Sequence, residues 1–442
     1  MESEITWSRL HDHIDLLTGF AFKSAGFIET GLGTPLLRGD NVAQGSLRWD
    51  SLRKWPSHEL KGLERYQLKT GDVVLAMDRP WIAAGLKYAR LRDSDVPSLL
   101  VQRVARLRGK NGLLQSYLSL LIGSPAFTEY VLSVQTGTTI PHISGSQIGG
   151  FEFELPSVTE QARAALLIGA IEDRIDLLRQ TNTTLEAIAQ ALFKSWFVDF
   201  DPVHAKAEGR DPEAMDAATA ALFPREFEES ELGPIPQGWS VKSFGDSVMI
   251  LGGGTPKTST PEYWDGDIPW FSVVDAPAAG QVFTLGTTKK ITQLGLDNCS
   301  AKLLPPMTTI ISARGTVGKV AMTGSEMAMN QSCYGLRPKM VDGEPFTYFS
   351  TLRFVDGLRQ VAHGAVFDTI TRSSFDELSA CRPPDNIIPC FGAMTTPLLD
   401  RIRMNGHQAI SLAAIRDILL PRLISGKLRL PEAIEAAEAT LA

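Results

Sequence analysis

The glycines and cations of residues 313–319 have the spacing in this chain that comes nearest to a chemical signature. A phosphate-binding loop of Walker type requires G-x-x-x-x-G-K-[ST], but Lys319 is followed by Val320, and Ala313 stands where the first glycine should be. The loop therefore lacks the signature of nucleotide hydrolysis. Its Arg314 and Lys319 remain as two cations on a short glycine-containing turn.

Signatures of DNA methyl transfer and DNA cleavage are also missing. An amino-methyltransferase carries an acidic or amide residue before Pro-Pro-aromatic, and neither residues 199–203 (DFDPV) nor residues 382–385 (RPPD) fit. The acidic-x-Lys pattern of nucleases occurs at Glu59–Lys61 without the Pro-Asp that should precede it. The four cysteines, Cys299, Cys333, Cys381 and Cys390, form no C-x-x-C and have no histidine at ligand spacing. We expect no catalytic residue, no metal site and no cofactor in this chain.

Basic loops after predicted strands are the better candidates for function. Arg314 and Lys319 follow a strand, where an arginine can fork onto guanine or phosphate. The first half offers a similar loop, in which Arg79, Trp81 and Lys87 follow another strand. For residues 313–319 alone, a plain hairpin with solvated cations is the better interpretation, and the recurrence of the pattern in the first half makes the two interpretations equally good.

Other loops carry residues of the same kind. Residues 251–258 (LGGGTPKT) could follow a phosphate backbone or form a hairpin tip, and His142 favours a structural hydrogen bond. Trp264 and Trp270 favour core or rim positions over base stacking. The candidate DNA contacts are Arg38, Arg79, Trp81, Lys87, Arg103, His142, Thr255, Lys257, Arg314, Thr316 and Lys319.

These loops require a β-rich scaffold. Gly33–Leu37, Asp72–Met77 and Leu99–Leu107 are predicted strands, and helices are predicted over residues 112–122 and 124–133. The pattern predicts an α+β domain with a mostly antiparallel, curved sheet over residues 1–155.

The second half repeats that order. A shift of 227 positions aligns residues 137–143 with 364–370, while Asp72–Met77 corresponds to Met307–Ser312 and residues 101–107 correspond to 330–336 at slightly different shifts. We therefore predict a second domain of the same fold over residues 237–385, and an internal pseudo-two-fold repeat.

Two long helices follow the domains. Between Thr159 and Asp201 a seven-residue apolar repeat lasts four heptads, and the same 227-position shift aligns it with a second seam that begins at Leu398. Asn182 and Asn405 are polar residues at core positions of these seams and would fix their register. About 39 residues at 1.5 Å each give a rod of roughly 58 Å. Pro421 predicts that the second helix kinks or ends near Leu420.

Composition adds little to this picture. Residues 156–236 carry seven basic against fifteen acidic groups, which accounts for the net charge of -7, and the flanking domains are near neutral. No apolar run reaches the eighteen residues of a membrane span. From the four cysteines, which form no C-x-x-C, we expect a reduced, cytoplasmic protein. The predicted parts are domain 1–155, helix 156–201, an acidic connector 202–236 with a short helix capped by Asp211, domain 237–385, and helix and tail 386–442.

Five segments remain to be explained: residues 193–203 (FKSWFVDFDPV), 231–239 (ELGPIPQGW), 420–428 (LPRLISGKL), 137–144 and 313–319. Together they resemble recurring elements of one family, the specificity subunits of type I restriction-modification systems. The resemblance covers nearly the whole chain. It implies two target-recognition domains, each reading half of a split DNA sequence, and two antiparallel helices that measure the spacer between the halves.

The resemblance also implies partners. Two modification subunits that bind S-adenosylmethionine and methylate adenine would dock on this chain, and two restriction subunits that use ATP and magnesium would complete the assembly. The expected docking surface includes Phe193 together with Trp196, Phe197 and Phe200, which are expected to be exposed. Two alternatives stay open: a DNA methyltransferase or nuclease with a cryptic active site, and a coiled-coil scaffold that does not read DNA.

Overall fold

The computed structural model describes residues 7–29, 32–49, 52–137, 139–278, 281–361 and 369–424. Its contacts divide the chain into unit 1, which runs to Arg174 and resumes at Ser411, and unit 2, from Ile175 to Ile410. Thr138, residues 364–368 of the second repeat, and the family-like segment after Ile424 lie outside the described residues.

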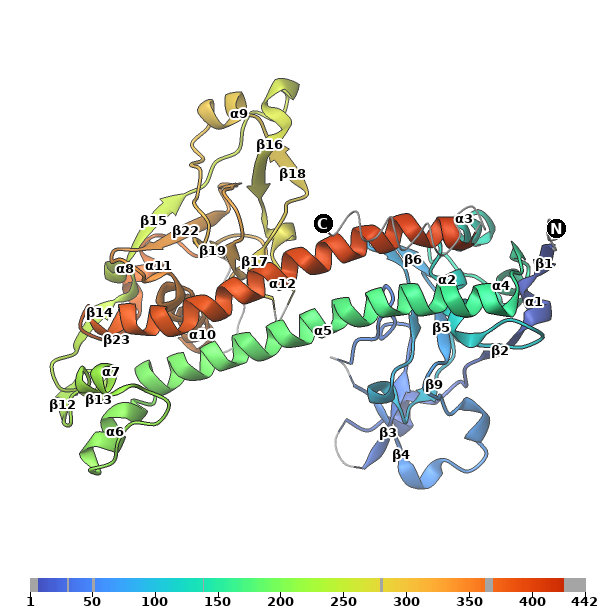
Figure 1. Ribbon diagram of the computed structural model, residues 1–442, viewed down its shortest axis with the longest axis horizontal. Coiled ribbons are helices and arrows are strands. Elements are labelled where there is room, and N and C mark those ends of the chain that lie inside the picture. Colours follow the sequence, from blue (N-terminus) through green and yellow to red (C-terminus); the bar gives the residue numbers. More distant parts are fainter. Residues whose placement is uncertain are drawn as a thin grey trace. The chain divides into compact units, whose positions relative to one another are not determined.

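Unit 1 is built on a four-stranded antiparallel sheet with the order β2-β10-β5-β8 (Figure 1). These strands are, in that order, Ile14–Thr18, Val104–Gly109, Val73–Ala76 and Tyr88–Arg90. All four residues of β5 are buried, as expected for a central strand with both faces covered. Helix α2 (Gln115–Ile122) packs on β5, β8 and β10.

Smaller elements complete unit 1. A second sheet has the order β4-β3-β9, in which β3 and β9 are parallel, and β1 pairs with β11 and β6 with β7. Their bounds are Lys54–Pro56 (β4), Gly33–Leu37 (β3), Leu99–Leu100 (β9), Trp7–Arg9 (β1), Glu152–Glu154 (β11), Trp81–Ile82 (β6) and Gly85–Leu86 (β7), with helices Leu10–His13 (α1), Pro125–Val134 (α3) and Gly145–Gly149 (α4). The predicted strand over residues 99–107 is two strands, because Arg103 adopts a left-handed φ of 69° between them.

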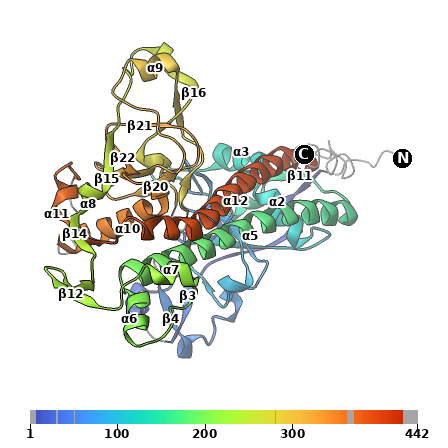
Figure 2. The ribbon, with the colours of Figure 1, turned by 60° about the vertical axis from the view of Figure 1, so that its left-hand side comes forward.

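Unit 2 repeats this plan. Its larger sheet has the order β15-β22-β19-β20-β17 and its smaller one β18-β16-β21, with β16 and β21 parallel as β3 and β9 are. The bounds are Val248–Gly252 (β15), Cys333–Pro338 (β22), Thr309–Ser312 (β19), Val320–Thr323 (β20), Phe283–Thr284 (β17), Lys289–Ile291 (β18), Trp264–Phe271 (β16) and Ala328–Met329 (β21). Helix α10 (Glu344–Val361) packs on β19, β20 and β22 in the place of α2. Figure 2 shows α9 (Gln293–Asp297) at one end of β16.

The predicted α+β fold, with its internal repeat and long helix pair, is therefore confirmed. The alignment of the central strands was wrong by one residue, however. Val104 and Cys333 begin equivalent strands, and they lie opposite Ala76 and Ser312 respectively, whereas the sequence comparison paired Ala76 with Ile311. Since successive side chains in a strand point to opposite faces, one residue of slip exchanges the faces.

The connector between the domains folds at the C-terminal end of α5 (Figure 1). It contains helices Asp201–Ala207 (α6) and Ala217–Ala221 (α7) and a hairpin of Phe227–Ser230 (β12) with Gly233–Pro236 (β13), after which β14 (Ser240–Ser243) pairs with β23 (Ser379–Arg382). The predicted Asp211 cap was wrong, because α7 begins at Ala217 and its N-cap is Asp216, whose Oδ1 accepts a hydrogen bond from the Thr219 amide at 2.9 Å. Short helices Phe244–Ser247 (α8) and Ser374–Glu377 (α11) complete unit 2.

Helices α5 (Val158–Phe197) and α12 (Ile387–Ile424) pack through the predicted seam. On α5 the buried positions include Ile175, Leu178, Asn182 and Ala189. On α12 the predicted positions Leu398, Ala409 and Leu423 are only half-buried, and Leu399 and Ile415 are buried beside them, because a 3.6-residue helix drifts against a seven-residue repeat.

The two helices are antiparallel within unit 2. Asn182 contacts Ile402 and Asn405, whereas Trp196, farther along α5, contacts Phe391, which comes earlier in α12. Both asparagines are buried: the Asn405 side-chain amide donates to Asn182 Oδ1 at 2.8 Å, and Asn182 Nδ2 donates to the Ile402 carbonyl at 3.1 Å. The prediction that these polar residues occupy the seam is confirmed.

The expectation was that α12 kinks or ends near Leu420. The helix does not end there, because it continues through Pro421 to Ile424, the last residue that the structure describes. Proline has no backbone N–H, so Pro421 removes only its own hydrogen bond from the helix. Among the described residues, the structure has no helix apolar enough over a sufficient length to cross a membrane.

Candidate nucleic-acid interface

In unit 1, two of the predicted DNA contacts, Arg103 and His142, meet at Asp78, just after the end of β5. Asp78 Oδ1 accepts a hydrogen bond from Arg103 Nη1 at 3.0 Å and lies 2.6 Å from His142 Nδ1. The backbone holds these residues together, since the Met77 amide donates to the Arg103 carbonyl and the Ile143 amide donates to the Met77 carbonyl. His142 therefore makes the structural hydrogen bond that its sequence context favoured.

The rest of this loop projects from the same edge. Arg79 is exposed with a left-handed φ of 45°, and its amide donates to the Pro141 carbonyl at 2.7 Å. Trp81 is 39% exposed although it lies in a strand, so its ring is open to a partner. Burial lowers the pKa of the half-buried Lys87 ammonium below its ordinary value, an effect opposed by Asp40 and reinforced by Arg79 and by Arg48, which the sequence did not single out.

Arg38 lies in a neighbouring turn. Its amide donates to Asn41 Oδ1 at 2.9 Å, and its guanidinium reaches Asp40 Oδ2 at 3.3 Å. The same turn recurs in unit 2, where the Ser272 amide donates to Asp275 Oδ2 at 2.9 Å. Arg38 therefore corresponds to a serine, and its charge is particular to unit 1.

The loop after β19 in unit 2 is held by its own backbone. Ser312 Oγ donates to the Thr316 carbonyl at 2.6 Å and accepts from the Lys319 amide at 2.8 Å. Gly315 and Gly318 take left-handed φ values of 77° and 78°, which a turn this tight requires. The side chains of Arg314, Thr316 and Lys319 are exposed, and those of Arg314 and Lys319 have no ion-pair partner within the described ranges.

The two loops occupy equivalent places in the two units. In unit 1 an isolated β-bridge pairs Asp78 with His142, and in unit 2 one pairs Arg314 with Thr369. The Ile143 amide donates to the Met77 carbonyl, and at the equivalent place the Ile370 amide donates to the Ala313 carbonyl. Arg314 therefore stands where unit 1 has Asp78, and Arg79 stands where unit 2 has Gly315. The sequence comparison, which set Arg79 beside Arg314, was wrong by one position.

Thr255 and Lys257 lie on the glycine-rich segment after β15. A Cβ on Gly253 would lie 1.9 Å from the Asn330 carbonyl oxygen, and one on Gly254 would lie 2.3 Å from the Ala301 amide nitrogen. These glycines therefore serve the packing of the chain, whatever the segment binds. Thr255 Oγ1 bonds to Gln331, and Lys257 is exposed.

The tryptophans nearby belong to the scaffold, as predicted. Trp270 is buried, and its indole donates to the Gly254 carbonyl at 2.9 Å. Trp264 packs edge-on against it, and Lys289 Nζ lies 5.5 Å from the Trp264 ring centroid. Across the residues that the structure describes, no group of three or more acidic, histidine or cysteine side chains is placed to hold a metal ion.

The model of the family "Type I restriction modification DNA specificity domain" matches residues 236–386. The chain is also 29% identical to the type I restriction enzyme HindI specificity subunit of Haemophilus influenzae, over 84% of this chain and 89% of that protein. It is 26% identical to the MjaIX specificity subunit of Methanocaldococcus jannaschii, over 73% of this chain and 71% of the relative.

The chain belongs to the specificity subunits of type I restriction-modification systems. This is a non-catalytic family of DNA-specificity proteins. A crystal structure of the S subunit from M. genitalium has the same fold, with a TM-score of 0.53 and 13% identity over 96% of this chain and 97% of that one.

In this specificity subunit, the aromatics predicted to form the docking surface are mostly core residues. Phe193, Trp196 and Phe197 are each at most 6% exposed, and Phe200 packs against the same cluster. Their rings contact other rings of unit 2, including Phe223, Trp239, Phe346, Phe349 and Phe391. The predicted exposure was wrong, because the connector and α10 supply apolar partners that the helical repeat alone does not reveal.

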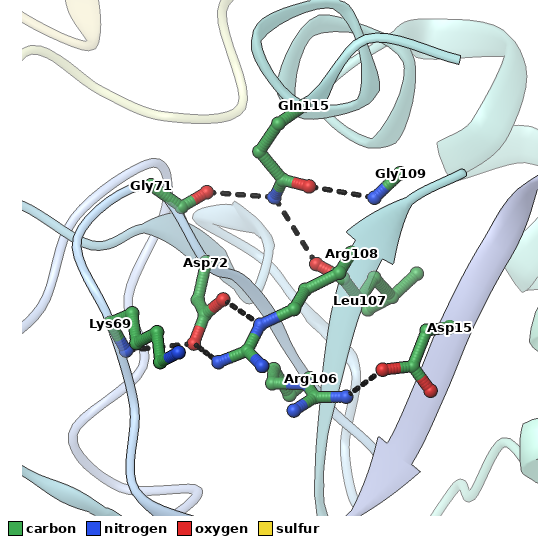
Figure 3. Close-up of polar contacts among 9 residues, drawn as sticks. All are labelled: Asp15, Lys69, Gly71, Asp72, Arg106, Leu107, Arg108, Gly109 and Gln115. Atoms are coloured by element: carbon green, nitrogen blue, oxygen red, sulfur yellow. Dashed lines mark hydrogen bonds and ion pairs between the residues drawn. The ribbon is translucent and has the colours of Figure 1, made fainter. Parts of the chain in front are cut away.

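Sequence reasoning missed a basic groove on the sheet of the specificity subunit's unit 1. It has a volume of about 300 Å³ and is lined in part by Arg65, Lys69, Arg106 and Arg108. Figure 3 shows Arg108 forking onto Asp72, with Nε to Oδ1 at 2.5 Å and Nη2 to Oδ2 at 2.8 Å. Arg106, in contrast, pairs with Asp15 while its buried Nε has no partner among the described residues (Figure 3). The alternation of Arg106 and Arg108 along one strand was the available sequence signal.

Proposed function

We propose that this specificity subunit reads a bipartite DNA target, with residues 1–155 and 237–385 acting as the two target-recognition domains. The observation that carries the proposal is the equivalence of the two loops that follow β5 and β19, the central strands of the two units. Exposed arginines lie at both places: Arg79 and Arg103 in unit 1, and Arg314 in unit 2. A single-site reader has no need of two copies of such a surface. Arginine forks onto the guanine edge in the major groove, and lysine and backbone amides hold phosphates.

The helix pair sets the gap between the two half-sequences. Helix α5 contains 40 residues and is therefore about 60 Å long at 1.5 Å per residue. This exceeds one turn of duplex, about 34 Å, so domains carried by such helices read separate segments. The buried Asn182–Asn405 pair supports this role, because a polar pair in an apolar seam disfavours other registers.

The assembly contains further subunits. Two modification subunits bring S-adenosylmethionine and methylate adenine, and two restriction subunits bring ATP and magnesium. The docking surface is the solvent face of the helix pair, where Leu177 and Ile188 on α5 and Met404 and Ile410 on α12 are each at least 45% exposed. Apolar side chains exposed along packed helices are suited to a partner helix.

Insertion of one heptad tests the proposal. Seven residues added to both helices preserve the seam, and the methylated motif of the assembly should then keep both half-sequences while its gap changes. A changed half-sequence with an unchanged gap would contradict the division of roles.

Labelled S-adenosylmethionine separates the proposal from a cryptic enzyme. Methyl transfer should need the modification subunit, and transfer by this chain alone would refute the proposal. Arg314→Ala with Lys319→Ala should weaken DNA binding by the intact assembly; unchanged DNA affinity would favour a scaffold that does not read DNA.

A further inference from the structure

We propose that Asp78 is a positioning residue that aims Arg103 at a guanine, and that the second unit offers its guanine-reading arginine, Arg314, from a different place. This inference rests on the proposed function. It assigns a role to an acidic residue within a basic loop.

The side chain of Arg103 is exposed, yet its guanidinium and its backbone are both held in place. Its side chain is 61% exposed, yet Nη1 is held at 3.0 Å by Asp78 Oδ1. Its backbone is fixed in the left-handed region at φ 69°, and its carbonyl accepts from the Met77 amide at 2.8 Å. Because a guanidinium has five N–H donors and this one uses a single donor among the described residues, a fork remains for the O6 and N7 acceptors of guanine.

Asp78 restrains two side chains at once. The carboxylate is about one-third exposed, and its Oδ1 also meets His142 Nδ1 at 2.6 Å, so one acceptor oxygen joins residues far apart in the chain. An arginine restrained before binding loses less rotamer freedom on binding. A carboxylate that faced DNA unpaired would repel phosphate, whereas here its charge is balanced by Arg103.

Unit 2 has a different set at the equivalent positions. Arg314 replaces Asp78 and Thr369 replaces His142, as the paired backbone bridges show. Ser332 replaces Arg103, since its carbonyl accepts from the Ala313 amide as that of Arg103 accepts from Met77. Arg314 of unit 2 therefore follows the end of β19, whereas Arg103 of unit 1 precedes the start of β10. The two half-sequences should carry their arginine-read guanine at different positions relative to the scaffold.

The test maps methylated adenines in cells that express the assembly with wild-type chain, Asp78→Asn, Arg103→Gly or Arg79→Gly. Glycine suits the left-handed conformation of both arginines, so these two variants remove a side chain without adding backbone strain. Arg79→Gly is the matched control, because it makes the same charge change beside the network and copies Gly315 of unit 2.

Arg103→Gly should lower the preference for guanine over other bases at one position of one half-sequence by about tenfold, and Asp78→Asn should relax that same position. Arg79→Gly should reduce methylation evenly and leave the motif unchanged. The inference is overturned if Arg103→Gly relaxes no position, or if Asp78→Asn leaves the motif intact while Arg103→Gly relaxes it. A wild-type motif that is not split would instead refute the proposed function.

Discussion

Replacing the buried asparagines of the helix seam should lower the free energy of unfolding by an amount that depends on whether one or both residues change. Asn405→Leu leaves Asn182 Oδ1 buried without its donor, and Asn182→Leu leaves the Asn405 amide without its acceptor. Each single change should lower the free energy of unfolding by about 1.5 kcal/mol, the cost of an unsatisfied buried polar group. The double leucine variant should lose about 1 kcal/mol or less, because two apolar side chains then meet in an apolar seam.

The double-mutant cycle should thus give a coupling of about 2 kcal/mol between the two positions. Urea titration of the full chain, followed by circular dichroism, measures it. Thr183→Leu with His407→Leu is the control, since both residues are exposed on the same two helices and should show no coupling. Additive losses at Asn182 and Asn405 would refute the account of the seam. The double variant should also produce methylated sites with more than one gap length, because no polar pair then selects one register.

Three further outcomes are expected. Asp72→Asn should destabilise the chain by about 3 kcal/mol in thermal unfolding, because the carboxylate is buried and forked by Arg108; a change within error would mean that this pair does not hold the sheet. Leu177→Asp with Ile188→Asp should leave the melting temperature unchanged and abolish co-purification with the modification subunit, and retained co-purification would place the docking surface elsewhere. Gly253→Ala should lower the melting temperature, because its Cβ would meet a backbone carbonyl at 1.9 Å, whereas a stable variant would show that the turn can shift.

The spacing of apolar residues, and the Gly, Pro and Asp residues that separate the strands, were enough to predict the scaffold. The heptad repeat predicted both long helices, and the apolar run of residues 73–76 predicted the central strand β5. Both patterns mark residues that pack against the rest of the protein. The repeat was visible from sequence order alone. The residue-by-residue alignment of the two copies was not visible, since they share few residues. It follows from the strand pairing, in which Val104 lies opposite Ala76 and Cys333 lies opposite Ser312.

The candidate site was predicted less completely. The sequence named Arg103, His142 and Arg314 as candidates. It did not name Asp78, because its carboxylate contacts residues 25 and 64 positions away in the chain. The aromatics of residues 193–197 were assigned to the surface because their partners in α10 and α12 are remote in sequence. Contacts of this kind depend on tertiary packing, which local patterns do not record.

The most direct test of the central claim is to co-express this chain with its modification subunit and to map methylated adenines across the host genome by single-molecule sequencing. The account predicts a split motif with one fixed, unspecified gap that disappears when this chain is omitted. A contiguous motif, or methylation that does not depend on this chain, would contradict it.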